Sequence, residues 1–380
     1  MTSSAASSWQ WVADTSTLAS VVELLKRADW VAVDTEFRRR DTFYPQVALV
    51  QLATAQGCWL IDPLTLGDAA PLVELLTCPA VIKVLHSASE DLEVFEHWLG
   101  CLPTPLFDSQ KAVAMIGRGF GLSYQALVAM YLAIEVGKEE TQSDWLARPL
   151  SDAQLRYAAQ DVVYLAQLYP SLLAEVAERD RVDWVLDEGE RAETGGRGPL
   201  AKFKSAWKLS ASQQSALVKL VQWRETQARQ RDKPRSWILA DKTINALVQR
   251  KPTSVRELAA VDGVGQGLVR RAGATLIDLI NSAPDADFDK VSATFTRPVA
   301  GPVKSVAKQL SPVLESMAEA LGVNVEIALP SRELELIARI AAGEAYEQPR
   351  HWQGWRQQHF VVPLLAQAQT LLAKSTGGCP

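Results

Sequence analysis

Cysteine and histidine are both scarce in this sequence, which has four of each among 380 residues. The four cysteines lie too far apart for a zinc knuckle or a redox pair; they are Cys58, Cys78, Cys101 and Cys379. So few cysteines in a chain of this length fit a reducing compartment. The histidines form no metal-ligand spacing either, so any metal in this protein must be bound by oxygen atoms.

Long apolar runs are also missing. No stretch approaches the roughly 20 consecutive apolar residues that a membrane-spanning helix needs. The N-terminal stretch MTSSAASSWQWVAD lacks the basic start and apolar core of a signal peptide. We therefore expect a cytoplasmic protein without a membrane partner. Its hydrophobic content of 48% provides enough apolar material for the two or three domains that this length suggests.

Charge is distributed unevenly along the chain. Residues 1–200 contain 15 Lys and Arg against 28 Asp and Glu, a net charge of −13. Residues 201–280 contain 15 against 6, a net charge of +9, and residues 281–380 contain 9 against 10. An acidic first part joined to a compact basic part suggests a catalytic region and a region that binds a polyanion. Ordinary surface variation is the alternative interpretation.

The first half alternates strand patterns with helix patterns. Runs of β-branched and aromatic residues predict strands at residues 30–37, 46–53, 58–62 and 81–86. The first three follow one another closely, which predicts antiparallel neighbours joined by hairpins. Apolar residues at helical spacing predict helices at 89–99 with Ser89 as N-cap, at 122–132, and from Ser151 onward. This mixture indicates a layered α/β domain.

The second half shows helical patterns only. Residues 189–206 are rich in Gly and charge and read as a linker. From 208 to about 282 short helices with turns between them predict a compact all-α unit. Loop-like stretches follow, and a second helical unit spans roughly 305–372.

Acidic residues stand at three places where a strand or helix would expose them to a common cleft. Asp34 and Glu36 lie two apart on the first strand and so face the same side. Asp91 lies in the first turn of a helix, where a negative charge is favourable without any function. Tyr157 and Asp161 lie four apart on one helix face. Each of these signals is modest alone, because an edge strand or an amphipathic helix explains it too.

Their order between residues 34 and 161 is much rarer than any one of them. With Asp-x-Glu, a later Asp and Tyr-x-x-x-Asp, the sequence resembles the tyrosine-bearing branch of the DEDD exonuclease superfamily. The likeness is greatest to the ribonuclease D family, in the stretches VAVDTEFRRRDTFYPQVALVQLA, VLHSASEDLEVF, GLSYQALV and KEETQSDWLARPLSDAQLRYAAQDVVYL. The basic helical region resembles an HRDC (helicase and ribonuclease D C-terminal) domain.

This resemblance implies an α/β ribonuclease H-like exonuclease domain, with a mixed sheet flanked by helices, followed by two small all-α HRDC-type domains. The expected division is exonuclease domain 1–188, linker 189–206, HRDC domain 207–284, linker 285–304 and a divergent HRDC-like domain 305–373.

The resemblance also implies the site. Asp34, Glu36, Asp91 and Asp161 match the four acids that bind two divalent cations, Mg²⁺ or Mn²⁺, and Tyr157 matches the tyrosine that positions the attacking water. Paired cations suit phosphodiester hydrolysis because they contact both the attacking and the leaving oxygen. Asp34 is expected to bridge the cations. Glu36 and Asp161 would bind the one that activates water, and Asp91 would bind the other, directly or through water.

Three further residues of the first half are candidates for RNA contacts. Arg38 follows the Asp-x-Glu strand and suits a phosphate, although a solvated charge is an equal alternative. Gln51 faces either the substrate or solvent. His86, at the end of the fourth strand, is better explained by a structural role near the site, and Asp108 is better explained as a helix N-cap.

The basic unit supplies the remaining candidates. Arg229 and Lys233 belong to a run of Lys and Arg interleaved with tryptophans, a pattern that binds nucleic-acid backbones without reading sequence. Gly263 and Gly265 precede a helix and could present backbone N–H groups to a phosphate. A tight turn between helices explains the two glycines equally well.

The prediction is therefore a monomeric 3′→5′ exoribonuclease that releases nucleoside 5′-monophosphates. The resemblance implies transfer-RNA precursors, and other structured RNAs with 3′ tails, as partners. A DNA 3′→5′ exonuclease with the same site is one alternative, because the contacts that recognise the 2′-hydroxyl cannot be placed from sequence. A non-catalytic nucleic-acid-binding scaffold is another.

Overall fold

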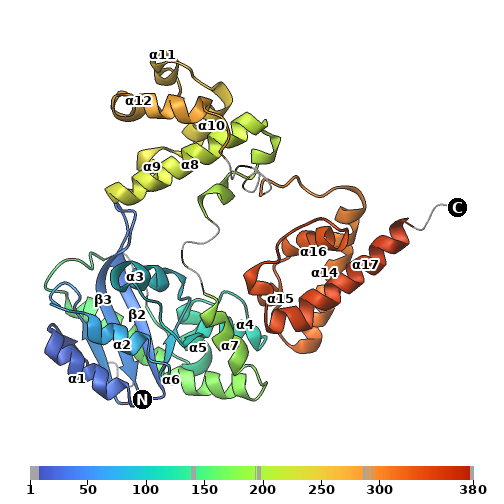
Figure 1. The fold of residues 1–380 in the computed structure, drawn as a ribbon. Coiled ribbons are helices and arrows are strands. Elements are labelled where there is room, and N and C mark those ends of the chain that lie inside the picture. Colours follow the sequence, from blue (N-terminus) through green and yellow to red (C-terminus); the bar gives the residue numbers. More distant parts are fainter. Residues whose placement is uncertain are drawn as a thin grey trace. The chain divides into compact units, whose positions relative to one another are not determined.

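The computed structural model describes residues 8–137, 143–192, 194, 198–285, 288, 291 and 294–376. Its contacts divide the chain into two compact units (Figure 1). The sheet unit falls within residues 1–38, 47–194 and 299–380. The helical unit falls within residues 39–46 and 195–298.

A six-stranded mixed sheet forms the centre of the sheet unit, in the order β1-β4-β3-β2-β5-β6. Its strands are β1 (Gln10–Val12), β2 (Trp30–Arg38), β3 (Gln46–Thr54), β4 (Gly57–Ile61), β5 (Ile82–Leu85) and β6 (Leu106–Asp108). The pairs β1–β4, β2–β5 and β5–β6 are parallel, and β3–β4 is antiparallel. The four predicted strands are confirmed, as is the hairpin between the second and third.

Helices cover the sheet on both sides (Figure 1). They are α1 (Thr15–Leu25), α2 (Ala70–Leu76), α3 (Ser89–Leu99), α4 (Ser109–Met115), α5 (Tyr124–Leu132), α6 (Asp152–Ala177) and α7 (Val182–Glu190). Buried side chains of α1, α2 and α3 form one apolar cluster with the sheet, and those of α4, α5 and α6 belong to the other. None of the helices in the described ranges is long and apolar enough to cross a membrane.

Strand β2 contributes to both clusters because side chains alternate along it. Val31 and Val33 belong to the cluster on the α1–α3 side, and Ala32 belongs to the cluster that contains α6. The same alternation directs Asp34 and Glu36 toward the α6 side.

Helix starts test two predicted N-caps, Ser89 and Asp108, and one predicted helix start at Ser151. Ser89 is wrong as N-cap of α3: Ala88 occupies that position, and no side chain caps it. Asp108 is confirmed as N-cap of α4, where its carboxylate accepts from the backbone N–H groups of Gln110 and Lys111. Ser151 begins α6 with a full capping box, which fixes where this long helix starts.

Four C-terminal helices complete the sheet unit. They are α14 (Gly301–Leu321), α15 (Val325–Ala328), α16 (Glu333–Ala341) and α17 (Val362–Thr376). Arg181 donates from its guanidinium to the carbonyls of Met115 and Leu321. The Trp184 and Trp355 rings stack at 4.8 Å with 7° between their planes. The C-terminal helices therefore share a core with the sheet and the helices on its α6 side, and α14 begins within the predicted linker 285–304.

The helical unit has its own core. Its helices are α8 (Ala211–Arg231), α9 (Arg235–Ile238), α10 (Asp241–Arg250), α11 (Val255–Ala259) and α12 (Gln266–Asn281), preceded by 3-10 turns at Pro199–Lys202 and Ala206–Lys208. Apolar residues of α8, α10 and α12 pack together with Phe203 and Ala206. The predicted all-α character of this region is confirmed.

Candidate active site

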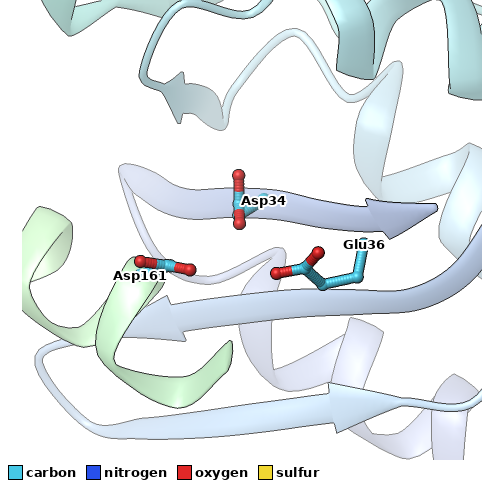
Figure 2. A group of neighbouring side chains, drawn as sticks. All are labelled: Asp34, Glu36 and Asp161. Carbon is cyan, nitrogen blue, oxygen red and sulfur yellow. The ribbon is translucent and has the colours of Figure 1, made fainter. Parts of the chain in front are cut away.

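Three carboxylates from two elements of the sheet unit meet on the α6 side of the sheet. Asp34 and Glu36 come from β2 and Asp161 from α6 (Figure 2). One oxygen of each lies within 4.8 Å of the others, and all three residues are half-buried. The sequence prediction that these distant residues converge is correct in its geometry.

A fourth carboxylate, Asp91, lies beside this group. It belongs to the first turn of α3 and is only 8% exposed. The Thr35 hydroxyl donates to it, and its negative charge raises the pKa of Asp34. Asp91 is thus held next to β2 by the residue between Asp34 and Glu36.

Tyr157 lies one turn before Asp161 on α6 and donates a side-chain hydrogen bond to it. Its ring packs against Trp145, with ring centres 6.0 Å apart. Trp145 is 3% exposed, so it limits the positions available to the tyrosine ring. The phenol oxygen is therefore aimed at the carboxylate group.

The four carboxyl groups are weaker acids than usual, because they are buried and because like charges lie close together. Burial, followed by the charges of the other carboxylates, raises the pKa of Asp34 and of Glu36 well above the usual range. Burial raises the pKa of Asp91 to about 7 and that of Asp161 to about 7. With raised pKa values the four carboxyl groups bind protons more readily than usual, and a divalent cation bound among them would favour their ionised forms.

His86 and Tyr124 support the site from the side of α5. The two ring nitrogens of His86 lie 2.9 Å from Ser109 Oγ and 3.1 Å from the Leu122 carbonyl oxygen. Tyr124 stacks edge-on against His86 and donates to the Gln160 carbonyl at 2.7 Å. Both ring nitrogens of His86 are engaged within the protein, which agrees with the structural role preferred from the sequence rather than with an RNA contact.

The loop before α6 is fastened by a buried ion pair. Arg148 donates to both carboxylate oxygens of Asp62, at 2.9 and 2.7 Å, and to the Ala48 carbonyl at 2.6 Å. It also donates to the Trp145 carbonyl at 2.8 Å. The Asp62 side chain is 2% exposed. This pair joins β3 and β4 to the loop that carries Trp145 and, through Trp145, supports Tyr157.

Of the other predicted RNA contacts in the sheet unit, that of Arg38 stays a prediction, whereas burial contradicts that of Gln51. Arg38 lies two residues beyond Glu36 on β2, half-exposed and on the same side of the strand. Gln51 has no exposed surface, so it cannot touch a substrate, and the prediction is wrong. Since β3 is buried on both faces, alternation along it does not separate an exposed side.

Arg229 and Lys233 make contacts within the helical unit. The Arg229 guanidinium lies 4.8 Å from the centre of the Phe43 ring and 3.1 Å from Glu225. Lys233 donates to the Asp41 carbonyl at 3.2 Å. Each still has exposed surface, so both remain candidates for a phosphate.

Gly263 is explained by packing. Its φ is +84°, and an added Cβ would stand 2.1 Å from Thr243 Oγ1. Gly265 is the N-cap of α12, with open space around it. The tight-turn interpretation therefore accounts for Gly263, whereas phosphate binding at the start of α12 stays a prediction.

Sequence reasoning missed Thr35, Tyr124 and the Asp62–Arg148 pair. Thr35 occupies the unspecified position of Asp-x-Glu, and alternation along the strand places it on the opposite face, toward α3. Asp62 and Arg148 are 86 residues apart, and no periodic pattern links residues at such a distance.

Comparison with known proteins identifies the family. The chain matches the 3′-5′ exonuclease family over residues 9–177 and the HRDC domain over residues 213–280. Ribonuclease D of Pseudomonas paraeruginosa is 38% identical over 363 residues, covering 94% of this chain and 96% of that protein. Ribonuclease D of Xanthomonas oryzae pv. oryzae is 35% identical over 365 residues, covering 93% and 98%.

A solved structure agrees with these matches. The crystal structure of Escherichia coli RNase D, described as an exoribonuclease involved in structured RNA processing, is similar with a TM-score of 0.82 and 28% identity. The similarity covers 96% of this chain and 99% of that one. The predicted mixed sheet flanked by helices is confirmed, as are an HRDC domain and a helical C-terminal region. That the C-terminal region is a second HRDC-type domain stays a prediction. The chain belongs to the ribonuclease D family.

Proposed function

We propose that this protein is a 3′→5′ exoribonuclease that hydrolyses RNA from its 3′ end and releases nucleoside 5′-monophosphates. The observation that carries the proposal is the meeting of Asp34, Glu36 and Asp161, with oxygens within 4.8 Å of one another. Like charges this close are unfavourable by themselves. A divalent cation offsets them, and the same cation favours attack on a phosphodiester.

The residues present fit two cations of the Mg²⁺ or Mn²⁺ type. The donors are carboxylate oxygens, which these ions prefer. Asp34, central to the group, would contact both; Glu36 and Asp161 would hold one, and Asp91 the other, directly or through water. When bound, such ions lower the pKa of a water molecule and stabilise negative charge on the phosphate.

The side chains around the cluster handle water and substrate. Tyr157, aimed at Asp161, would orient the attacking water and accept a hydrogen bond from it or donate one to it. Trp145 and Arg148 hold that phenol in place. Arg38, on the same side of β2 as Glu36, would pair with a phosphate of the substrate strand.

Structured RNAs with 3′ tails, transfer-RNA precursors among them, are the substrates we propose. Support comes from the family and from the net charge of +9 over residues 201–280, which favours a polyanion of any sequence. We further propose that the protein acts as a monomer in the cytoplasm.

A labelled RNA with a structured body and a single-stranded 3′ tail tests the function. With the label at the 5′ end and Mg²⁺ present, we expect a ladder that shortens from the 3′ end and stalls near the structured body. EDTA should stop the reaction, and excess Mg²⁺ should restore it. The released products should be nucleoside 5′-monophosphates by chromatography.

A DNA strand of the same sequence is the matched control. Faster degradation of DNA than of RNA would reject RNA as the preferred substrate. RNA binding without any shortening, in Mg²⁺ or Mn²⁺, would reject catalysis altogether and leave a binding scaffold.

A further inference from the structure

A hollow in the helical unit has no part in the site described above. Its volume is about 680 Å³, within the range of about 300–1,000 Å³ typical of small-ligand pockets. Its lining residues come from two parts of the chain, one within 198–207 and one comprising Val291 and residues 294–296. The first precedes the HRDC match at 213–280 and the second follows it, so neither matched domain accounts for the hollow.

Three aromatic side chains contribute to the lining. Phe203, Trp207 and Phe295 all contribute, together with Pro199 and Leu200. Phe203 is 7% exposed and belongs to the core of the unit, whereas Trp207 and Phe295 are half-buried. Fixed aromatic faces that stay partly open to solvent are the surfaces on which unpaired bases stack.

Positive charge lies along one of the two segments that line the hollow. Lys204 lines the hollow and is exposed, and the exposed Lys208 places its ammonium 5.3 Å from the centre of the Trp207 ring. Between residues 198 and 208 the sequence has three lysines and no acidic residue. An aliphatic peptide or a neutral lipid would gain nothing from these lysines, whereas a nucleotide matches both the aromatic lining and the charge.

We propose that this hollow binds one unpaired nucleotide of an RNA strand. The base would lie against Trp207, and the adjoining phosphates would meet Lys204 and Lys208. The proposal rests on the proposed function for its choice of RNA, and it adds a second hold on the substrate that does not depend on base identity.

Binding to a catalytically inactive protein tests this without relying on hydrolysis. In an Asp34→Asn background, the Kd for a fluorescent single-stranded RNA is measured by anisotropy at fixed salt. We expect Trp207→Ala to weaken binding about tenfold, the loss typical of one stacked base. Trp207→Phe, which keeps an aromatic face, should stay within about threefold of the parent.

The helical unit contains a matched control. Trp237 is 64% exposed and also lies near a lysine, with Lys233 Nζ 5.8 Å from its ring, but it does not line the hollow. Trp237→Ala should change the Kd less than twofold. Lys204→Ala should lower the slope of log Kd against log salt by about one, and this substitution of an exposed residue leaves the core intact.

Several results would overturn the proposal. Equal losses for Trp207→Ala and Trp237→Ala would mean that the surface binds RNA diffusely. An equal loss for fully duplex RNA would exclude an unpaired nucleotide. An unchanged Kd together with lost binding of the neutral dye Nile red would assign the hollow an apolar occupant. None of these results depends on nuclease activity, which is measured separately in the protein without Asp34→Asn.

Discussion

Two acidic sites in the sheet unit, Asp62 and the cluster of Asp34, Glu36 and Asp161, differ in what balances their negative charge. Asp62 is 2% exposed and accepts two hydrogen bonds from Arg148. Oxygens of Asp34, Glu36 and Asp161 lie within 4.8 Å of one another. Burial raises the pKa of all three, and the neighbouring carboxylates also raise the pKa of Asp34 and of Glu36. Asp62 has its counter-charge within the chain, whereas the cluster has mainly further carboxylates around it.

This difference separates a structural acid from a functional one. A buried carboxylate with an arginine partner holds two segments together, and removal of either partner leaves an unpaired charge. Carboxylates that repel one another weaken the fold unless something binds among them. The two groups should therefore respond to substitution in opposite ways.

The largest expected effect is the loss of catalysis on neutralising the cluster. Asp34→Asn or Asp161→Asn should lower kcat/KM on RNA on the order of a thousandfold, since each removes a charge that holds the cations. Without metal, neither variant should unfold more easily than the parent. Nuclease assays check the loss of catalysis, and urea unfolding in EDTA checks the stability without metal. Near-normal degradation by either variant would refute the assignment.

A smaller loss of activity is expected for Tyr157→Phe. Removal of the phenol oxygen should lower kcat about 10- to 100-fold, with little change in KM, because water is oriented less well. Single-turnover kinetics at saturating enzyme measure the chemical step. Tyr131→Phe, which alters a tyrosine in α5, provides the control, and an equal loss there would remove the special role of Tyr157.

Asp62→Asn should show the reverse pattern, a loss of stability. Breaking a buried pair costs about 3–5 kcal/mol. Arg148 is 23% exposed and can partly rehydrate, so we expect about 2 kcal/mol less free energy of unfolding. Urea unfolding gives this value. A variant as stable as the parent would show that the pair contributes nothing to the fold.

The smallest effect is a pH dependence of the metal-free fold. Carboxylates with a raised pKa bind protons more tightly in the folded state, so stability falls as pH rises from about 4 to about 7. In EDTA the Tm should drop by about 2–4 °C between pH 5 and pH 7.5, and Mg²⁺ should restore it at the higher pH.

Asp161→Asn is the control for this pH effect. Because it removes the Asp161 group, whose pKa burial raises to about 7, the drop in Tm should be smaller than in the parent. Identical curves for the two proteins would show that the cluster does not govern the pH dependence.

Much of the candidate site could be predicted from the periodicity of single strands and helices. Alternation along β2 placed Asp34 and Glu36 on one side, and helical spacing placed Tyr157 above Asp161, because both periods follow from backbone geometry alone. The order of these residues along the chain then indicated the resemblance to the ribonuclease D family. What remained hidden depends on tertiary contacts: the hydroxyl of Thr35 on Asp91, the phenol of Tyr124 beside His86, and Arg148 reaching across to Asp62.

The prediction that Gln51 contacts the substrate was wrong for a related reason. A strand with one solvent-exposed face has polar residues at every second position, but β3 is buried on both faces. A single polar residue there gives no sign of which side it faces or whether solvent reaches it. Burial on both faces is a property of the sheet and not of the strand's own sequence.

The packing of the C-terminal segment against α4 and α7 has a consequence for synthesis of the chain. The helical unit lies between these helices and the rest of the sheet unit in sequence, so it can close its own core while its neighbour is still incomplete. Until residues beyond 299 leave the ribosome, Trp184 lacks the Trp355 ring that stacks on it, and Arg181 lacks the Leu321 carbonyl. Translation that stops before α14 thus leaves an apolar surface for chaperones and proteases to recognise.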